Sequence, residues 1–247
     1  MHPFLSYGLL ALAGIILFFL WRPWCAKYPQ WQDALPAVIL IGTPLALVSS
    51  HVVYYLTPGT LHSGYRAFFL TLEGWRAGYP SSGLAIGAML SIWLASAIHR
   101  LPVIELFDLY SPGVFVTSAI WRVGCFAHGC CYGAPTSLPW GVRFTLVQEL
   151  NMKTPPCHPV QLYEVFISVL ILAALPFLLN RFDVHPGKGV LLAVCAFLYS
   201  FERFVLEFFR IGGTSQRVFA GMSSAQLVTL VVMIVIVVGG IVCWRRR

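Results

Sequence analysis

Long apolar runs separated by short polar segments dominate the pattern of this chain. Five runs approach the length of about 20 residues that a helix needs to cross a membrane; they cover 4–21, 35–56, 159–179, 189–209 and 224–244. A shorter run at 82–98 is rich in small residues, which suits a helix packed closely against its neighbours. A last run, 104–125, is interrupted by Pro112 and Gly113 and carries charges, so it must lie against protein or a water-filled cavity. We therefore expect an all-α fold: a polytopic membrane protein of about seven transmembrane helices.

Composition and charge agree with this interpretation. Hydrophobic residues make up 58% of the 247 residues and charged residues only 10%, far from the balance of a soluble domain. The net charge of +7 does not indicate nucleic-acid binding, because the one basic run is the terminal 245–247, which is typical of a cytoplasmic stop after a span. We expect a single helical transmembrane domain over 1–247, with extracytoplasmic loops at 57–81 and 122–158.

Two arginines, Arg122 and Arg203, lie inside these apolar runs. A charged side chain at the bilayer centre costs about 2.5–3.5 kcal/mol on an insertion scale, so such residues usually face a protein-lined cavity and have a partner there. A natural partner for guanidinium groups at that depth is an anion that also resides in the membrane, such as a phospholipid phosphate.

The second arginine belongs to a polar stripe on the predicted helix 189–209. With about 100° between successive residues, Tyr199, Arg203, Glu207 and Arg210 lie within an arc of about 80°. Arg203 and Glu207 are four residues apart, where a salt bridge can form. One such pair could be structural, but two arginines with a glutamate and a tyrosine on one face favour a functional site.

The segment WRVGCFAHGCCYGAP, at 121–135, is a second candidate. We expect Gly124, Gly129 and Gly133 to break the helix and let backbone N–H groups approach a ligand, while Arg122 supplies the charge.

A third candidate is CHPVQLYE, at 157–164, which enters the next span. Pro159 suits a helix start. Gln161 and Glu164 then lie on the first turn, and Tyr163 at the depth of the membrane interface. Tyr163 could also be an ordinary interfacial aromatic residue, and Gln161 an ordinary polar residue at a helix start.

These segments resemble the prolipoprotein diacylglyceryl transferases, bacterial inner-membrane enzymes that lipidate the lipobox cysteine of preprolipoproteins. The family's H-P-S-Q-L-Y-E is similar to HPVQLYE, and its Tyr-x-x-x-Arg-x-x-x-Glu-Phe-Phe-Arg is matched by YSFERFVLEFFR at 199–210. Its signature G-R-x-G-N-F-x-N-G-E-x-x-G is similar to WRVGCFAHGCCYG at 121–133, and its first-span Tyr-Gly to SYGLL at 6–10. The resemblance covers nearly the whole chain. It implies seven spans, phosphatidylglycerol as donor, a prolipoprotein as acceptor and no cofactor.

The sequence also departs from the family pattern. The two asparagines of the signature are Cys125 and His128 here, and its glutamate is Cys130. The histidine of the family's H-G-G-L is replaced by Ser81, in SSGL at 81–84. The two arginines that the family treats as essential are kept. The anion-handling part is therefore preserved, while the part near the acceptor is rewritten. His128 could replace the missing histidine as a base, although a satisfied loop histidine is commoner.

The resemblance implies that a cysteine thiolate attacks the glycerol carbon of phosphatidylglycerol and glycerol 1-phosphate leaves. Arg203 would hold the phosphate with help from Arg122, and Glu207 would orient Arg203. Tyr7 or Tyr199 would bind the headgroup. The remaining candidates for substrate contact are Ser81, Gly83, Gly124, Gly129, Gly133, Gln161, Tyr163, Glu164 and Arg210.

Four cysteines in two loops favour competing interpretations: Cys125, Cys130, Cys131 and Cys157. With two nearby histidines they could bind zinc, although C-x4-C-C is not a recognised zinc pattern. A disulfide from Cys125 or Cys130 to Cys157 would suit an extracytoplasmic face. A redox role for the adjacent pair, or packing as small hydrophobic residues, stays open.

Three functions follow from these patterns. The first is a diacylglyceryl transferase. The second is a family offshoot that acts on another phospholipid headgroup or thiol acceptor. The third is a non-enzymatic, cysteine-rich membrane protein that binds metal.

Overall fold

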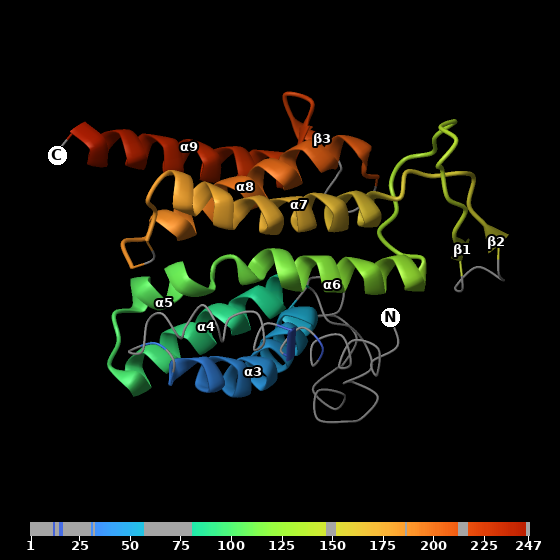
Figure 1. The fold of residues 1–247 in the computed structure, drawn as a ribbon. Coiled ribbons are helices and arrows are strands. Elements are labelled where there is room, and N and C mark those ends of the chain that lie inside the picture. Colours follow the sequence, from blue (N-terminus) through green and yellow to red (C-terminus); the bar gives the residue numbers. More distant parts are fainter. Residues whose placement is uncertain are drawn as a thin grey trace. The chain divides into compact units, whose positions relative to one another are not determined.

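The computed structural model describes residues 12, 15–16, 31, 33–56, 81–146, 152–185, 187–211 and 217–245. Within these residues the fold is helical (Figure 1), with α3 (Ala34–Leu56), α4 (Ser81–His99), α5 (Val103–Tyr110), α6 (Gly113–His128), α7 (Val160–Arg181), α8 (Val190–Leu206) and α9 (Ser224–Arg245). A 3-10 turn, η3 (Glu207–Phe209), follows α8. Two antiparallel hairpins pair β1 (Thr145–Leu146) with β2 (Met152–Lys153), and β3 (Arg217–Phe219) with β4 (Met222–Ser223). The chain divides into two compact units, 1–110 and 111–247.

The expectation of an all-α membrane protein is confirmed. Among the described residues, four helices are long and apolar enough to cross a membrane: α3, the Ser82–His99 part of α4, α7 and the Ser224–Cys243 part of α9. A fifth span exists if α5 and α6 form one broken span, as the Pro112–Gly113 interruption predicts. The predicted count of about seven is not reached in this part of the chain. The run at 189–209 becomes the 17-residue α8 followed by a 3-10 turn, and most of the run at 4–21 lies outside the described residues.

In the first unit, α3 and α4 pack with their backbones in close contact. A Cβ atom on Gly83 would lie 2.3 Å from the Ser50 Cα, and one on Gly87 would lie 2.4 Å from the Ala46 Cα. The Ser49 hydroxyl donates a hydrogen bond to the Gly83 carbonyl over 2.7 Å. Gly83, predicted as a substrate contact, is therefore a helix-packing position, because only a residue without a side chain fits there.

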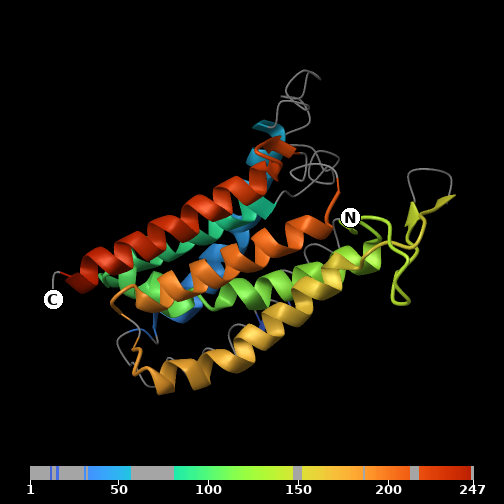
Figure 2. The same cartoon turned by 90° about the horizontal axis from the view of Figure 1, so that it is seen from above.

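In the second unit, α6 packs on α7, α7 on α8 and α8 on α9, so that the four helices lie side by side (Figures 1 and 2). Large apolar side chains such as Phe166 and Phe177 on α7, and Val228 and Val235 on α9, are more than half exposed. Apolar surface of this extent on spans is what lipid covers in a membrane protein.

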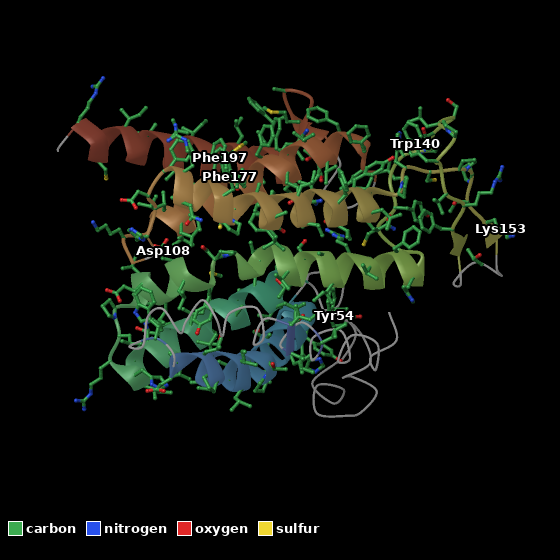
Figure 3. All side chains as sticks on the ribbon, in the orientation of Figure 1. Tyr54, Asp108, Trp140, Lys153, Phe177 and Phe197 are labelled. Atoms are coloured by element: carbon green, nitrogen blue, oxygen red, sulfur yellow. The ribbon has the colours of Figure 1, made fainter. Side chains whose placement is uncertain are left out.

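The connection from α6 to α7 folds against the end of this unit where α7 begins. In Figure 3, Trp140 and Lys153 lie beyond that end, whereas Phe177 lies near the opposite end of α7. Val142 and Cys157 exchange both backbone hydrogen bonds, over 3.0 and 2.9 Å. The predicted loop 122–158 is shorter than expected, because α6 continues to His128 and α7 begins at Val160.

Candidate active site

A polar stripe runs down the otherwise apolar helix α7. The helix begins directly after Pro159, as predicted. Gln161, Glu164 and Ser168 are all at most 5% exposed, and their spacing of three and four residues places them on one helix face. Burial of polar side chains without partners is costly, yet the Gln161 Oε1 and the Ser168 hydroxyl have no hydrogen-bond partner among the described residues.

Glu164 is the point where three arginines meet. Its Oε2 pairs with the Arg122 Nε of α6. Its Oε1 accepts a hydrogen bond from the Arg210 Nη1 over 3.1 Å and lies 3.7 Å from the Arg203 Nη1. The arginine side chains are 14–18% exposed and that of Glu164 is 6% exposed. One buried carboxylate therefore holds guanidinium groups from three separate segments of the chain.

Glu207 is the second carboxylate of this group. Its Oε2 lies 3.1 Å from the Arg203 Nη2, which confirms the predicted salt bridge between residues four apart, and 3.8 Å from the Arg210 Nε. The Ser223 hydroxyl donates a hydrogen bond to its other oxygen over 3.2 Å. We call Arg122, Arg203, Arg210, Glu164 and Glu207 the arginine cluster.

Ser223 contacts the arginine cluster through Glu207, and the sequence interpretation did not include it. Its hydroxyl accepts a hydrogen bond from the Gln226 N–H over 3.2 Å, and its own N–H donates to the Gln226 Oε1 over 3.0 Å. This reciprocal pair is a capping box at the start of α9, and S-x-x-Q is its sequence signal. The cap also fixes Glu207, so the beginning of α9 helps to position Arg203.

The arginine cluster carries a surplus of positive charge. Three guanidinium groups and two carboxylates give three minus two, a net charge of +1. Glu202 is also buried on α8; it lies near enough to Arg122 and Arg203 to interact with their charges, but in the described part of the chain it forms no ion pair with them. The positive surplus of the five side chains can attract an anion.

The predicted stripe on the helix is wrong in one respect. The α-helix ends at Leu206, the 3-10 turn follows, and Arg210 adopts an extended conformation with φ −93° and ψ 157°. Arg210 reaches Glu164 because its backbone forms a bridge with Gly133 of the α6–α7 connection. Tyr199 is 37% exposed, and its ring lies against Phe115, with 6.4 Å between the centroids.

The glycines of the 121–135 segment differ from one another: the prediction that they break the helix is wrong for Gly124 and confirmed for Gly129. Gly124 lies inside α6. Gly129 ends the helix with φ +76°, and its N–H donates to the Phe126 carbonyl. The Gly133 N–H donates to the His158 carbonyl over 2.9 Å. The N–H groups of Gly129 and Gly133 are thus used within the protein, and contact of these glycines with a substrate stays a prediction.

Other predicted residues lie around the cluster. The Gln161 Nε2 donates to the Cys130 carbonyl over 2.7 Å. The Tyr163 hydroxyl accepts a hydrogen bond from the Trp140 Nε1 over 2.9 Å and lies 3.2 Å from the His158 Nδ1. His128 is exposed at the last turn of α6. Tyr7 and the side chain of Ser81 lie outside the described residues.

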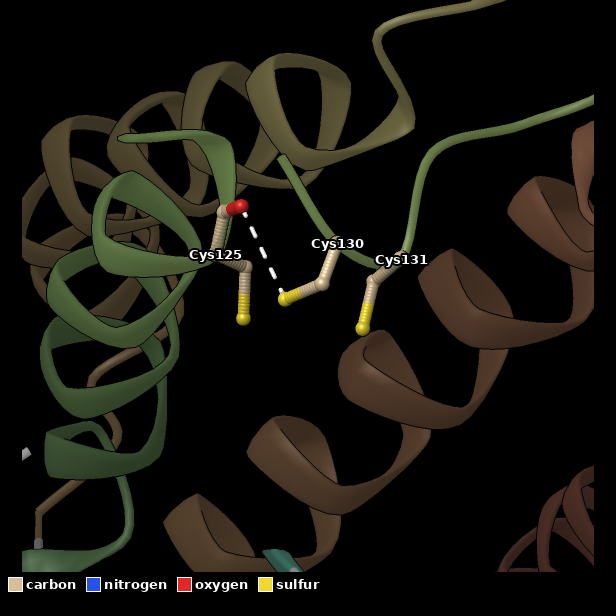
Figure 4. A group of neighbouring side chains, drawn as sticks. All are labelled: Cys125, Cys130 and Cys131. Atoms are coloured by element: carbon tan, nitrogen blue, oxygen red, sulfur yellow. Dashed lines mark hydrogen bonds between the residues drawn. The ribbon is translucent and has the colours of Figure 1, made fainter. Parts of the chain in front are cut away.

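Three of the four candidate cysteines come together (Figure 4). The sulfur atoms of Cys125, Cys130 and Cys131 all lie within 4.8 Å of one another. Cys157 is buried apart from them, and its thiol donates to the Pro155 carbonyl over 3.2 Å. All four are free thiols, so the disulfide to Cys157 that the loops suggested is not formed. Hydrogen bonds from Cys125 and Cys130 lower the pKa of the Cys131 thiol, and the charges of nearby guanidinium groups lower it further.

Comparison with known proteins identifies relatives over nearly the whole chain. The model of the family described as prolipoprotein diacylglyceryl transferase matches residues 2–243. The phosphatidylglycerol–prolipoprotein diacylglyceryl transferase of Porphyromonas gingivalis is 28% identical over 224 residues, which cover 85% of this chain and 77% of that protein. The protein of the same name from Gloeobacter violaceus is 28% identical over 249 residues, 98% of this chain and 88% of that protein. The one from a Wolbachia strain of Culex pipiens is 29% identical over 190 residues, 73% and 66% respectively.

Proposed function

We propose that this chain, which belongs to the prolipoprotein diacylglyceryl transferase family, moves a diacylglyceryl group from phosphatidylglycerol to a cysteine thiol of a prolipoprotein. Glycerol 1-phosphate is the second product, and the reaction takes place in the bacterial inner membrane. The observation that carries the proposal is the convergence of Arg122, Arg203 and Arg210 on two carboxylates, with a net charge of +1 left over.

The charge on the phosphate group changes in the direction that this cluster favours. In phosphatidylglycerol the phosphate is a diester with one negative charge. When the bond between the glycerol carbon and the phosphate oxygen breaks, the phosphate leaves as a monoester with about two negative charges at neutral pH. Guanidinium groups fixed in a poorly hydrated site therefore stabilise the transition state more than the bound donor.

The two carboxylates hold the arginines ready before the donor binds. Arg203 is fixed between Glu207 and Glu164, and Arg210 is fixed to Glu164. A preorganised guanidinium needs no reorientation as charge develops on the leaving group. We assign Arg203 and Arg122 to the phosphate and Glu207 and Glu164 to the positioning of these arginines.

The attacking group is the acceptor's thiolate. It forms a carbon–sulfur bond at the glycerol carbon while the carbon–oxygen bond breaks, and the thiol proton goes to solvent or to a base. Thiolates, rather than thiols, are the nucleophiles in such displacements, and the positive surplus beside the reacting carbon favours that form.

Transfer can be measured with purified protein, vesicles containing phosphatidylglycerol, and a peptide that carries a lipobox cysteine. The mass of the peptide reports addition of the diacylglyceryl group, and glycerol 1-phosphate is measured separately. We expect Arg203→Ala to lower the rate about 10²–10³-fold, the cost of removing one fixed donor to a developing anion. Arg143→Ala is the matched control, because this exposed arginine lies in the α6–α7 connection outside the arginine cluster.

Three outcomes would contradict the proposal. Peptide modification that is equally fast in Arg203→Ala and Arg143→Ala would remove the arginine cluster from the reaction. Release of glycerol phosphate with no modified peptide would indicate a different acceptor. Failure of the wild-type chain to rescue a strain depleted of its own diacylglyceryl transferase would exclude the prolipoprotein as its acceptor in the cell.

A further inference from the structure

The arginine cluster accounts for the leaving group of the proposed transfer but not for the cysteine trio, Cys125, Cys130 and Cys131. One thiol comes from the last turns of α6 and two from the residues that follow the end of this helix. Figure 4 shows the three side chains extending into the same space. Packing alone does not require three thiols to meet, because two of them are not buried.

The separation of the sulfur atoms is close to that of a metal site. Zinc binds thiolates at about 2.3 Å, which places tetrahedral sulfur ligands about 3.8 Å from one another. The three sulfur atoms already lie within 4.8 Å of one another. Side-chain rotations that bring them about 1 Å closer together would therefore give the spacing of zinc ligands. Soft thiolate ligands select zinc or copper(I) over harder ions.

The backbone holds the two loop cysteines in place. Cys131 has φ +63°, a left-handed conformation that is uncommon for residues other than glycine and that persists only where surrounding structure enforces it. The carbonyl of Cys130 accepts a hydrogen bond from the buried Gln161 Nε2 over 2.7 Å. Strained, anchored backbone of this kind is frequent at ligand sites.

The charges around the trio suit a thiolate-bound dication. Three thiolates and one divalent ion carry a net charge of −1. Arg122 lies three residues before Cys125 on α6, and Arg210 forms a backbone bridge with Gly133, two residues after Cys131. The positive surplus of the arginine cluster therefore lies close enough to attract the negatively charged group that zinc and three thiolates would form.

Three ligands leave one position of a tetrahedral ion open. Cys125 is buried, Cys130 half-buried and Cys131 exposed, so one side of the trio is accessible. The buried Gln161 Oε1 has no hydrogen-bond partner within the described part of the chain, although its side chain is fully buried. This carbonyl oxygen can accept a hydrogen bond from a bound molecule next to Cys130.

We propose that Cys125, Cys130 and Cys131 bind one zinc ion through their sulfur atoms, and that the open fourth position takes the thiolate of the acceptor cysteine. The second half of this proposal rests on the proposed function. The acceptor thiol gives its proton to solvent when its sulfur binds zinc. The zinc-bound sulfur then forms the bond to the glycerol carbon as the carbon–oxygen bond to phosphate breaks, and no electron is gained or lost overall. Metal sites with three protein ligands and an open position are the usual catalytic arrangement for zinc.

The first experiment measures metal content. The full chain is purified in detergent with a phosphine reductant, exposed to zinc, desalted, and analysed for metal and protein. We expect about one zinc per chain in wild type and in Cys157→Ser, the matched control, whose serine can keep the hydrogen bond to Pro155. We expect loss of zinc in Cys131→Ser, which changes an exposed thiol, and in the triple serine variant. Wild-type protein without zinc, with the three thiols still titratable or joined as a disulfide, would overturn the proposal.

The second experiment uses cobalt(II) in place of zinc, because bound thiolates give cobalt a charge-transfer absorption. The wild type should show this band, Cys131→Ser should lose it or bind cobalt at least tenfold more weakly, and Cys157→Ser should match wild type. A lipobox peptide with cysteine should increase the band, whereas the same peptide with serine should not. No change with the cysteine peptide would overturn the fourth-ligand assignment.

The two proposals fail in distinguishable ways. If metal and peptide bind as expected but no diacylglyceryl group is transferred, the proposed function is wrong and the zinc site stands. If transfer proceeds at the wild-type rate in Cys131→Ser and in chelator-treated protein, the assignment of the acceptor thiolate to the fourth zinc position is wrong and the transferase stands.

Discussion

Replacement of Glu164 by glutamine tests whether one carboxylate holds the arginine cluster together. The substitution keeps the shape of the side chain and removes its negative charge. The net charge of the cluster then changes from three minus two to three minus one, that is from +1 to +2. Arg122 loses the carboxylate with which it pairs, Arg210 keeps only its contact of 3.8 Å with Glu207, and Arg203 keeps Glu207 at 3.1 Å.

The size of the effect follows from the distances. Two unit charges 3.1 Å apart attract each other by about 5 kcal/mol at an effective dielectric constant of about 20. Rearrangement of the arginines recovers part of this, and the loss of one partner of a buried ion pair typically costs about 3–5 kcal/mol. We expect Glu164→Gln to lower the free energy of unfolding by that amount. Glu105→Gln should cost only about 1 kcal/mol, because Glu105 accepts one hydrogen bond from the neutral Trp31 indole.

Unfolding by sodium dodecyl sulfate in mixed micelles, followed by tryptophan fluorescence, measures both variants under one condition. In a second set of unfolding measurements, lipid is added to the micelles. Phosphatidylglycerol should recover part of the stability that Glu164→Gln loses, because an anion replaces the missing negative charge, whereas neutral phosphatidylcholine should recover none. Equal costs for Glu164→Gln and Glu105→Gln, with no difference between the two lipids, would refute the electrostatic role of Glu164.

Two further predictions concern the α6–α7 connection. Gly133→Ala should lower the free energy of unfolding by more than about 2 kcal/mol in the same assay, since its Cβ would lie 2.4 Å from the Phe209 carbonyl oxygen. The control is Gly239→Ala on α9, which should be neutral or stabilising because nothing lies within 4 Å of its Cβ. Equal costs for the two variants would refute the packing argument. In metal-free, reduced protein, the lowered pKa of Cys131 keeps its thiolate populated at pH values where an ordinary thiol, with a pKa of about 8.5, is protonated. Iodoacetamide should therefore alkylate Cys131 readily at pH 6. Cys130→Ala removes a hydrogen-bond donor and should shift the dependence of the alkylation rate on pH to higher pH. An unchanged pH dependence would contradict the role of this hydrogen bond.

Much of the helical fold could be predicted from the sequence. The expected runs at 35–56, 159–179 and 224–244 differ from α3, α7 and α9 by at most two residues at each end. A segment of about 20 apolar residues has few alternatives, because its backbone polar groups must be satisfied internally in a bilayer. The Arg203–Glu207 pair could be predicted in the same way, since residues four apart meet on any α-helix.

The residue at which α8 ends could not be predicted from the sequence pattern. The helical pattern continues through Arg210, yet the chain leaves the α-helix after Leu206. The reason lies elsewhere in the chain: Arg210 bridges Gly133, and the Ala134 N–H donates to the Phe209 carbonyl over 2.7 Å. Periodicity does not report such long-range backbone pairing.

Residue patterns along the chain were enough to predict most of the helices, the two charged residues deep in apolar runs, and the resemblance to a transferase family. The contacts of Glu164 with three arginines, and the meeting of Cys125 with Cys130 and Cys131 while Cys157 lies apart, became visible only in the folded chain. A helical pattern fixes neighbours within one helix, whereas contacts between helices depend on their rotation, their depth and the path of the loops between them.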